Sequence, residues 1–248
     1  MLILFSIIGF FFDKTGTIPG GIVEFLGNAF LFHLSYNGAW WFVLTYVFLV
    51  LLSPLLFMLT RKFPAILLVP ASGVLYFCAH VFRFVMVPEF SSPIVSWVVT
   101  QALLLGTSQF GYIVGMLFRK YRWITKLRTF CKVHSKIMKL AICVIPVVLF
   151  LLHCIEQSAI IAPITGIGTI VCFWLWKKPQ WVERITLFFG KHSTNIWLAH
   201  MFFYSVLFKN FVFIAKYPIL IFLLMIAICL LFSIPINGLL SHLRKSKP

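Results

Sequence analysis

GKHSTNIWLAH, residues 190–200, leads directly into the apolar run 201–208. Polar and ionisable side chains are costly inside a membrane, so their presence beside such a run is a functional hypothesis. In the alternative interpretation, Ser193 and Asn195 cap a helix that begins after them. Capping does not account for His200, which lies about one and a half helical turns further along. The stretch therefore predicts both a helix and a polar site within it.

The composition around this stretch is that of a membrane protein. Of 248 residues, 62% are hydrophobic and 10% are charged, and the formal net charge is +16. Basic loops on the inner side of a membrane explain this charge, so we expect no nucleic-acid partner. The six cysteines form no CxxC pair and the chain has no ligand spacing typical of zinc, so we expect neither a disulfide framework nor a metal.

Hydropathy predicts an all-α, polytopic transmembrane helix bundle with seven full spans and a partial first one. The partial span is Met1–Phe12, which is shorter than the roughly 20 residues that a span requires. The full spans are expected at 39–59, 65–87, 94–118, 140–155, 158–176, 195–208 and 218–240. We expect residues 1–248 to form a single integral membrane domain. In the span at 94–118, Gly106, Gly111 and Gly115 predict close helix packing.

The basic residues predict the orientation of these spans. Seventeen Lys and Arg lie in loops on one side and at the C-terminus, and three lie on the other side. The positive-inside rule therefore places the C-terminus in the cytoplasm. The basic segment 119–139 is either an amphipathic helix on an anionic inner leaflet or an ordinary connector. Its charge could also attract a phosphorylated donor.

Two polar layers follow from this topology. The outer layer contains His80, Arg83, His153 and Glu156, with each helix contributing an i,i+3 pair. These residues form either a substrate site or a structural ion pair, with Glu89 as another partner for Arg83. The inner layer contains His192, Ser193, Asn195 and His200, and Ser193, Trp197 and His200 follow one helical stripe. His200 is either a general base that orients a hydroxyl or a hydrogen-bonded structural histidine.

An aromatic cluster, GAWWF at 38–42, opens the first full span. Trp41 is either part of an interfacial aromatic belt or a stacking surface for a sugar ring. The residues alone predict a polytopic helical bundle with polar groups near both leaflets and do not indicate a specific reaction.

Three stretches resemble one known family. GKHSTNIWLAH at 190–200 resembles the signature G-K-x-S-x-x-x-[YW]-L-x-H near the end of acyltransferase-3 family membrane O-acyltransferases. The stretches 39–54 and 111–117 are similar to two shorter motifs of that family, in the same order. The resemblance covers nearly the whole chain and assigns Ser193, Trp197 and His200 to the signature and Trp41 to the mid-chain aromatic.

The resemblance implies a multi-pass protein of the bacterial cytoplasmic (inner) membrane. It implies transfer of an acyl group, often acetyl, from cytoplasmic acyl-CoA to a hydroxyl of a surface carbohydrate. Acyl-CoA (acetyl-CoA) is then a co-substrate, with no tightly bound cofactor. The expected partners are the lipid bilayer, acyl-CoA and a carbohydrate acceptor. We expect His200 and Ser193 to be catalytic, and Trp41, Trp197, Arg83, Glu156, His80 and Asn195 to bind substrate.

The family's catalytic histidine lies in a first helix that has no counterpart in this chain. We therefore expect a truncated or degenerate member, or one half of a split pair whose membrane partner supplies the missing helices. Two other functions stay open: a transporter or flippase of a lipid-linked sugar, and a non-catalytic membrane subunit.

Overall fold

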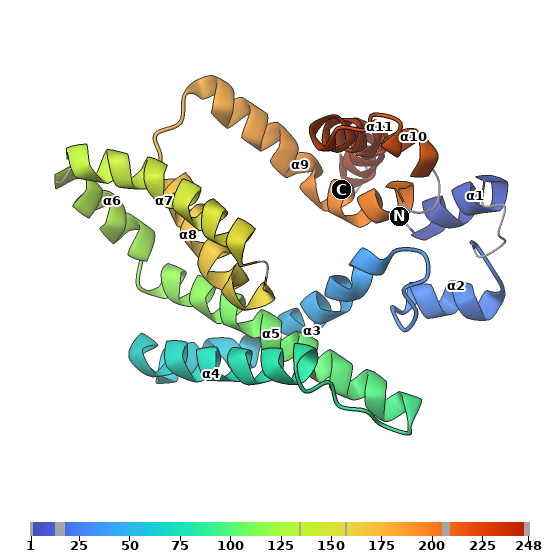
Figure 1. Cartoon of the computed structure of the whole chain (residues 1–248), viewed down its shortest axis with the longest axis horizontal. Helices are drawn as coiled ribbons and strands as arrows, with labels where there is room; N and C mark the ends of the chain where they lie inside the picture. Colours follow the sequence, from blue (N-terminus) through green and yellow to red (C-terminus); the bar gives the residue numbers. More distant parts are fainter. Residues whose placement is uncertain (1, 13–17, 134, 157, 205–208, 246–248) are drawn as a thin grey trace. The chain divides into compact units, whose positions relative to one another are not determined.

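The structure is a computed structural model that describes residues 2–12, 18–133, 135–156, 158–204 and 209–245. Throughout these residues the regular secondary structure is helical (Figure 1), as the sequence predicts. The chain divides into two compact units, residues 1–44 with 179–248 and residues 45–178. That residues 1–248 form a single integral membrane domain stays a prediction.

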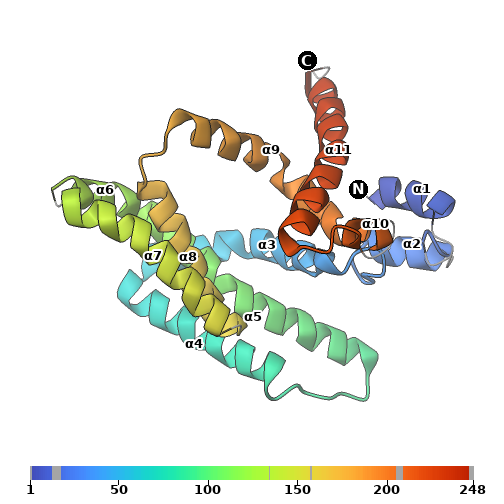
Figure 2. The ribbon, with the colours of Figure 1, turned by 45° about the horizontal axis from the view of Figure 1, so that its top comes forward.

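The first unit contains the two ends of the chain. Its elements are α1 (Leu2–Phe12), α2 (Ile22–Ala29), the 3₁₀ turn η1 (Gly38–Trp40), α9 (Gln180–Phe202), α10 (Lys209–Phe213) and α11 (Pro218–Lys245). The end of α9 packs against α11 (Figure 2).

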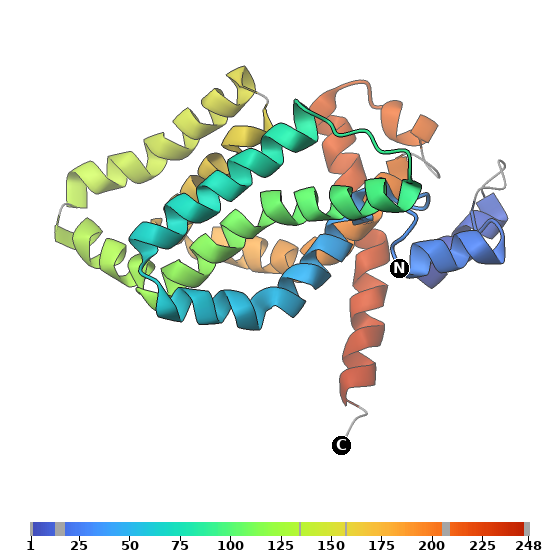
Figure 3. The same ribbon diagram turned by 90° about the horizontal axis from the view of Figure 1, so that it is seen from below.

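The second unit begins within α3 (Trp41–Lys62). It continues with α4 (Ala65–Phe84), α5 (Pro93–Lys120), α6 (Trp123–Val133), α7 (Ser135–Ile155), the 3₁₀ turn η2 (Ala159–Ile161) and α8 (Ala162–Leu175). The pairs α4–α5 and α7–α8 lie side by side, and Figure 3 shows α4 and α5 along their length. The segment 119–139 thus comprises the end of α5, the helix α6 and the beginning of α7.

Five helices in the described parts of the chain are long and apolar enough to cross a membrane. They are Gly38–Lys62, Ala65–Phe84, Pro93–Lys120, Lys136–Ile155 and Pro218–Leu243. The predicted count of seven full spans is not confirmed. The predicted span at 158–176 is a shorter apolar stretch, Ala159–Leu175. The one at 195–208 is the second half of α9, and its end at 205–208 lies outside the described residues.

The boundaries of α9 correct the capping interpretation. The helix begins at Gln180 after Pro179 and runs through the whole 190–200 stretch, so Ser193 and Asn195 lie in its interior. Ser193 donates its hydroxyl proton to the Gly190 carbonyl at 2.9 Å, one turn back. Charged residues such as Glu183 and Lys191 hide this first half from a hydropathy scan, although Trp181 and Phe188 continue the helical pattern.

Small residues let α4 and α5 approach closely. The prediction of close helix packing is confirmed at Gly106, one of the three glycines for which it was made. A Cβ added to Gly106 would lie 2.7 Å from the Ala79 Cβ, so only glycine permits this approach. Gly111 and Gly115 have open space beside them, and the prediction of close packing is wrong there.

The core of the first unit is aromatic. Phe5 from α1 and Phe202 from α9 are fully buried, and their rings stack with centroids 3.9 Å apart. Trp40 stacks on the other side of this pair, 5.6 Å from Phe5. The partial first segment therefore contributes to the packing that holds the end of α9.

Candidate functional site

The facing surfaces of α9 and α11 carry a polar network made by His192, Asn195, Ser233 and Asn237. His192 and Ser233 are buried, and His192 Nδ1 lies 2.8 Å from Ser233 Oγ. Asn195 Nδ2 donates to Ser233 Oγ and to Asn237 Oδ1, both at 3.0 Å. Because buried polar groups require partners, this network specifies how the two helices face each other.

The network fixes which ring nitrogen of His192 accepts a hydrogen bond. Asn237 Nδ2 donates to the Lys191 carbonyl at 3.1 Å, which sets the orientation of the Asn237 amide. The same Nδ2 lies 3.1 Å from His192 Nδ1, so Nδ1 must be the acceptor. The neutral ring then carries its proton on Nε2. His192 has its lone pair committed to the network and serves the packing of α9 on α11.

His200 has the opposite arrangement. Its Nδ1 lies 2.7 Å from the carbonyl oxygen of Trp197, which can only accept, so Nδ1 carries the proton. The lone pair of the neutral ring is then on Nε2. A backbone carbonyl that holds Nδ1–H is a common device for presenting Nε2 to another group. His200 is half-buried and suited to accept a proton or a hydrogen bond from a hydroxyl.

Aromatic side chains lie beside this part of α9. Phe42 packs edge-on against Trp197 with ring centroids 5.9 Å apart, and Trp41 packs edge-on against Phe42 at 5.6 Å. Trp41 is 37% exposed. Trp41, Trp197 and His200 therefore belong to one unit and to one chain of contacts, which the sequence did not predict, and their substrate and catalytic roles stay predictions.

The Leu198 carbonyl holds η1 against α9. Asn37 Nδ2 donates to this oxygen at 2.6 Å and Trp40 Nε1 donates at 3.0 Å. Both donors come from the start of the aromatic stretch, so they fix where Trp41 and Phe42 lie along α9.

A second polar cluster holds the loop that precedes η1. Asn28, which is buried, donates to Ser35 Oγ at 2.8 Å, and its Oδ1 accepts from the Tyr36 N–H at 3.1 Å. Ser35 donates a hydrogen bond to Glu24, which also pairs with His33 at 3.3 Å. The Ser35 hydrogen bond, with a smaller contribution from His33, holds the pKa of the Glu24 carboxyl below its usual value of 4.5.

Ser193 is exposed and does not lie at His200. Seven residues along a helix correspond to about 10 Å, which is too far for a direct hydrogen bond between the two side chains. Ser193 and His200 thus do not act as a nucleophile and base pair, and the catalytic assignment of Ser193 stays a prediction.

The other predicted substrate residues, His80, Arg83 and Glu156, belong to the second unit. His80 is 7% exposed, packs between the rings of Tyr76 and Phe84, and has a buried Nδ1 without a partner. The Arg83 guanidinium lies 4.7 Å from the centroid of the Phe84 ring. Glu156 accepts a hydrogen bond from the Ser158 N–H at 3.2 Å.

A hydrogen bond joins α4 to the segment that follows Glu156. The Tyr76 hydroxyl donates to the Ala159 carbonyl at 2.6 Å, which ties α4 to the turn η2 that follows Glu156. The substrate roles of His80, Arg83 and Glu156 stay predictions.

Sequence reasoning missed two members of the α9–α11 network, Ser233 and Asn237. Their signal was present: two polar residues spaced i,i+4 in the most apolar of the five membrane-capable helices among the described residues. Asn28 lies near the end of the short amphipathic helix α2 and Ser35 lies in the loop after it, and no motif in the sequence links the two residues. Within the described residues no three His, Cys, Asp or Glu side chains gather as a metal site would require.

Comparison with known proteins gives one match. The acyltransferase-3 family model, described as an acyltransferase domain, matches residues 1–238. This match covers nearly the whole chain and includes both units. No curated protein and no solved structure matches the chain.

Proposed function

This chain belongs to the acyltransferase-3 family of membrane proteins, and from that premise we propose that it transfers an acetyl group from cytoplasmic acetyl-CoA to a hydroxyl of an exported or surface carbohydrate. The site is the part of the first unit around His200, Trp197 and Trp41. The observation that carries the proposal is the 2.7 Å contact between His200 Nδ1 and the Trp197 carbonyl oxygen, from which we infer that the lone pair of the neutral ring lies on Nε2.

The reaction needs one proton transfer that His200 can perform. Its Nε2 accepts the proton of the acceptor hydroxyl while the hydroxyl oxygen attacks the thioester carbonyl carbon. The C–S bond then breaks, and the CoA thiolate takes the proton from Nε2. The products are an ester and free CoA, and the imidazole returns to its starting state.

The aromatic groups beside His200 fit a carbohydrate acceptor. Sugar rings present C–H faces that pack on exposed aromatic rings, and Trp41 offers such a face at the start of α3. Trp197 lies one turn before His200, so a ring held at these aromatics has its hydroxyls near Nε2. Asn195 takes part in the network that holds this stretch of α9 against α11.

The charge of the second unit favours an anionic donor. Lys126 and Lys132 on α6 are exposed. Arg128 donates to the Trp174 carbonyl at 3.2 Å, which joins α6 to α8. Such a cationic surface attracts the phosphates of acyl-CoA and, by the positive-inside rule, faces the cytoplasm of a bacterial inner membrane.

Substitution of His200 tests the proposal. We expect His200→Ala to lower the rate of carbohydrate acetylation by about 10²- to 10⁴-fold, the usual contribution of a general base. The full-length protein is assayed in membranes with labelled acetyl-CoA, and the label in the carbohydrate is measured. The control is His242→Ala, which removes an exposed histidine from α11. Equal rates in the two variants contradict the role of His200.

A further inference from the structure

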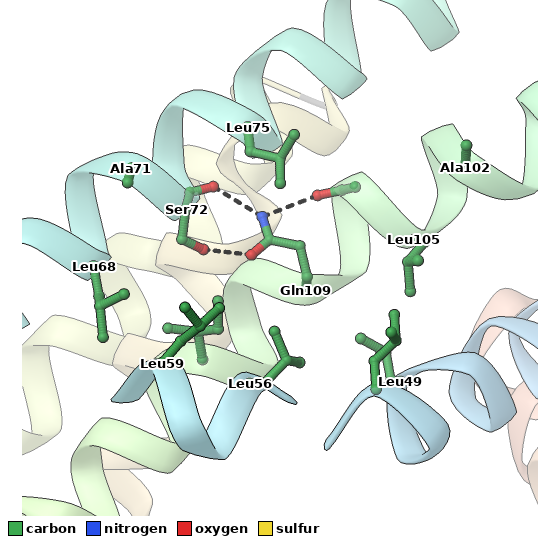
Figure 4. A pocket seen from close by; sticks show the side chains of 13 residues that line it. Leu49, Leu56, Leu59, Leu68, Ala71, Ser72, Leu75, Ala102, Leu105 and Gln109 are labelled. Atoms are coloured by element: carbon green, nitrogen blue, oxygen red, sulfur yellow. Dashed lines mark hydrogen bonds between the residues drawn. The ribbon is translucent and has the colours of Figure 1, made fainter. Parts of the chain in front are cut away.

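Helices α3, α4 and α5 line an open, apolar cavity of about 370 Å³ within the second unit. Figure 4 shows Leu56 and Leu59 of α3 opposite Leu68 of α4 and Leu105 of α5. A second cavity of about 350 Å³ adjoins it, because Leu52, Ala102 and Leu105 line both. We call the two cavities together the α3–α5 trough.

Two polar side chains in the trough satisfy each other. The Ser72 hydroxyl donates to Gln109 Oε1 at 2.6 Å, and Gln109 Nε2 donates back to the Ser72 carbonyl at 2.9 Å and to the Gly106 carbonyl at 3.2 Å (Figure 4). Both amide protons of Gln109 are thereby used. This pair holds α4 to α5 and does not present a free group to a ligand.

The amide of Gln101, unlike that of Gln109, has an oxygen without a hydrogen-bond partner. Gln101 lines the second cavity, one turn before Leu105, and this oxygen, Oε1, is buried. Burying a carbonyl oxygen without a hydrogen-bond partner is unfavourable, so its presence in a native fold requires an explanation. The terminal torsion of Gln101 is soft, so we infer that a rotation about it brings this oxygen to a ligand in the trough.

The lining determines what can occupy the trough. The lining is almost entirely apolar, and each volume falls in the range of small-molecule sites. Leu51 and Val98 at the second cavity are 70% and 52% exposed, so the trough opens to the surface of the membrane-capable helices α3 and α5. In a bilayer, helices of this length and composition border lipid hydrocarbon.

We propose that the α3–α5 trough binds the hydrocarbon chain of a membrane lipid that carries a hydroxyl or amide N–H group, and that this group donates to Gln101. The leucines take up the chain, and Gln101 selects lipids with a donor. The proposal does not rest on the acyl-transfer function.

A photoreactive long-chain alcohol tests this proposal. The probe is 1-dodecanol with a diazirine in its chain, and its methyl ether has the same chain without the donor. The full chain is placed in phosphatidylcholine vesicles, irradiated with either probe, and analysed by peptide mass spectrometry. We expect labels on α3 and α5 at the trough, severalfold stronger for the alcohol than for the ether.

Three variants complete the experiment. Ala102→Trp fills the trough from an exposed position and is expected to lower trough labelling severalfold, whereas Val74→Trp, at an exposed position of α4 outside the lining, leaves it unchanged. Gln101→Leu keeps the shape and is expected to make the two probes label equally. Undiminished labelling in Ala102→Trp overturns the site, and a preserved alcohol preference in Gln101→Leu overturns the role of Gln101.

Discussion

Two histidines on α9, eight residues apart, hold their ring protons on different nitrogens. The amide of Asn237 makes Nδ1 of His192 an acceptor, whereas the carbonyl of Trp197 makes Nδ1 of His200 a donor. Of the two, only His200 keeps the lone pair of Nε2 out of the α9–α11 network, as the proposed general base requires. The sequence could not make this distinction, because it depends on Ser233 and Asn237, about 40 residues further along the chain.

At the same scale, the carboxyl of Glu24 links stability to pH. Hydrogen bonding by Ser35 lowers its pKa below 4.5 in the folded state, so the carboxylate stabilises the fold at and above that pH. This stabilisation is lost as the pH falls through the lowered pKa. We expect Glu24→Gln to lower the melting temperature at neutral pH, and the difference from the wild type to vanish in acid below the folded-state pKa. Thermal unfolding across this pH range measures it, and a difference that persists in acid contradicts the assignment.

Among the elements, the sequence predicted the presence of the helices better than the residues at which they begin and end. Strongly apolar segments such as 65–87 and 94–118 became α4 and α5 with ends displaced by a few residues. The prediction failed at α9, because its first half alternates charged and apolar residues and lies outside any hydropathy window. His192, Asn195 and His200 stand out in the sequence because they are polar residues beside an apolar run. Asn28 bonds to Tyr36 and Asn37 bonds to Leu198, and no sequence pattern predicts these contacts.

The position of Ser193 in the interior of α9 allows a test of where this helix begins. Replacing an N-cap serine by alanine costs about 0.5–2 kcal/mol. We expect Ser193→Ala to change the free energy of unfolding by less than about 0.5 kcal/mol, because Ser193 is an exposed residue in the middle of a helix. Denaturant unfolding in detergent measures the change. A loss of more than about 1 kcal/mol, at the level of a cap, argues for a helix that begins near Asn195.

At the scale of the whole molecule, charge predicts how the chain lies in the membrane. Basic residues concentrate in the loops of one side, and α11 is the last membrane-capable helix before the C-terminus. We expect a fluorescent reporter fused after Pro248 to be active in the cytoplasm and a periplasmic phosphatase fused there to be inactive. When each reporter is instead fused at Glu89, in the loop between α4 and α5, we expect the phosphatase to be active and the fluorescent reporter to be inactive. Phosphatase activity at the C-terminus contradicts the orientation.

Consumption of acyl-CoA distinguishes the proposed acyl transfer from transport. The measurement is the release of free CoA thiol when acetyl-CoA and the carbohydrate acceptor are added to the full chain in membrane vesicles. We expect thiol release in step with ester formation on the carbohydrate, and loss of both in His200→Ala. Carbohydrate crossing the vesicle membrane without any thiol release contradicts the proposed acyl transfer and indicates a transporter.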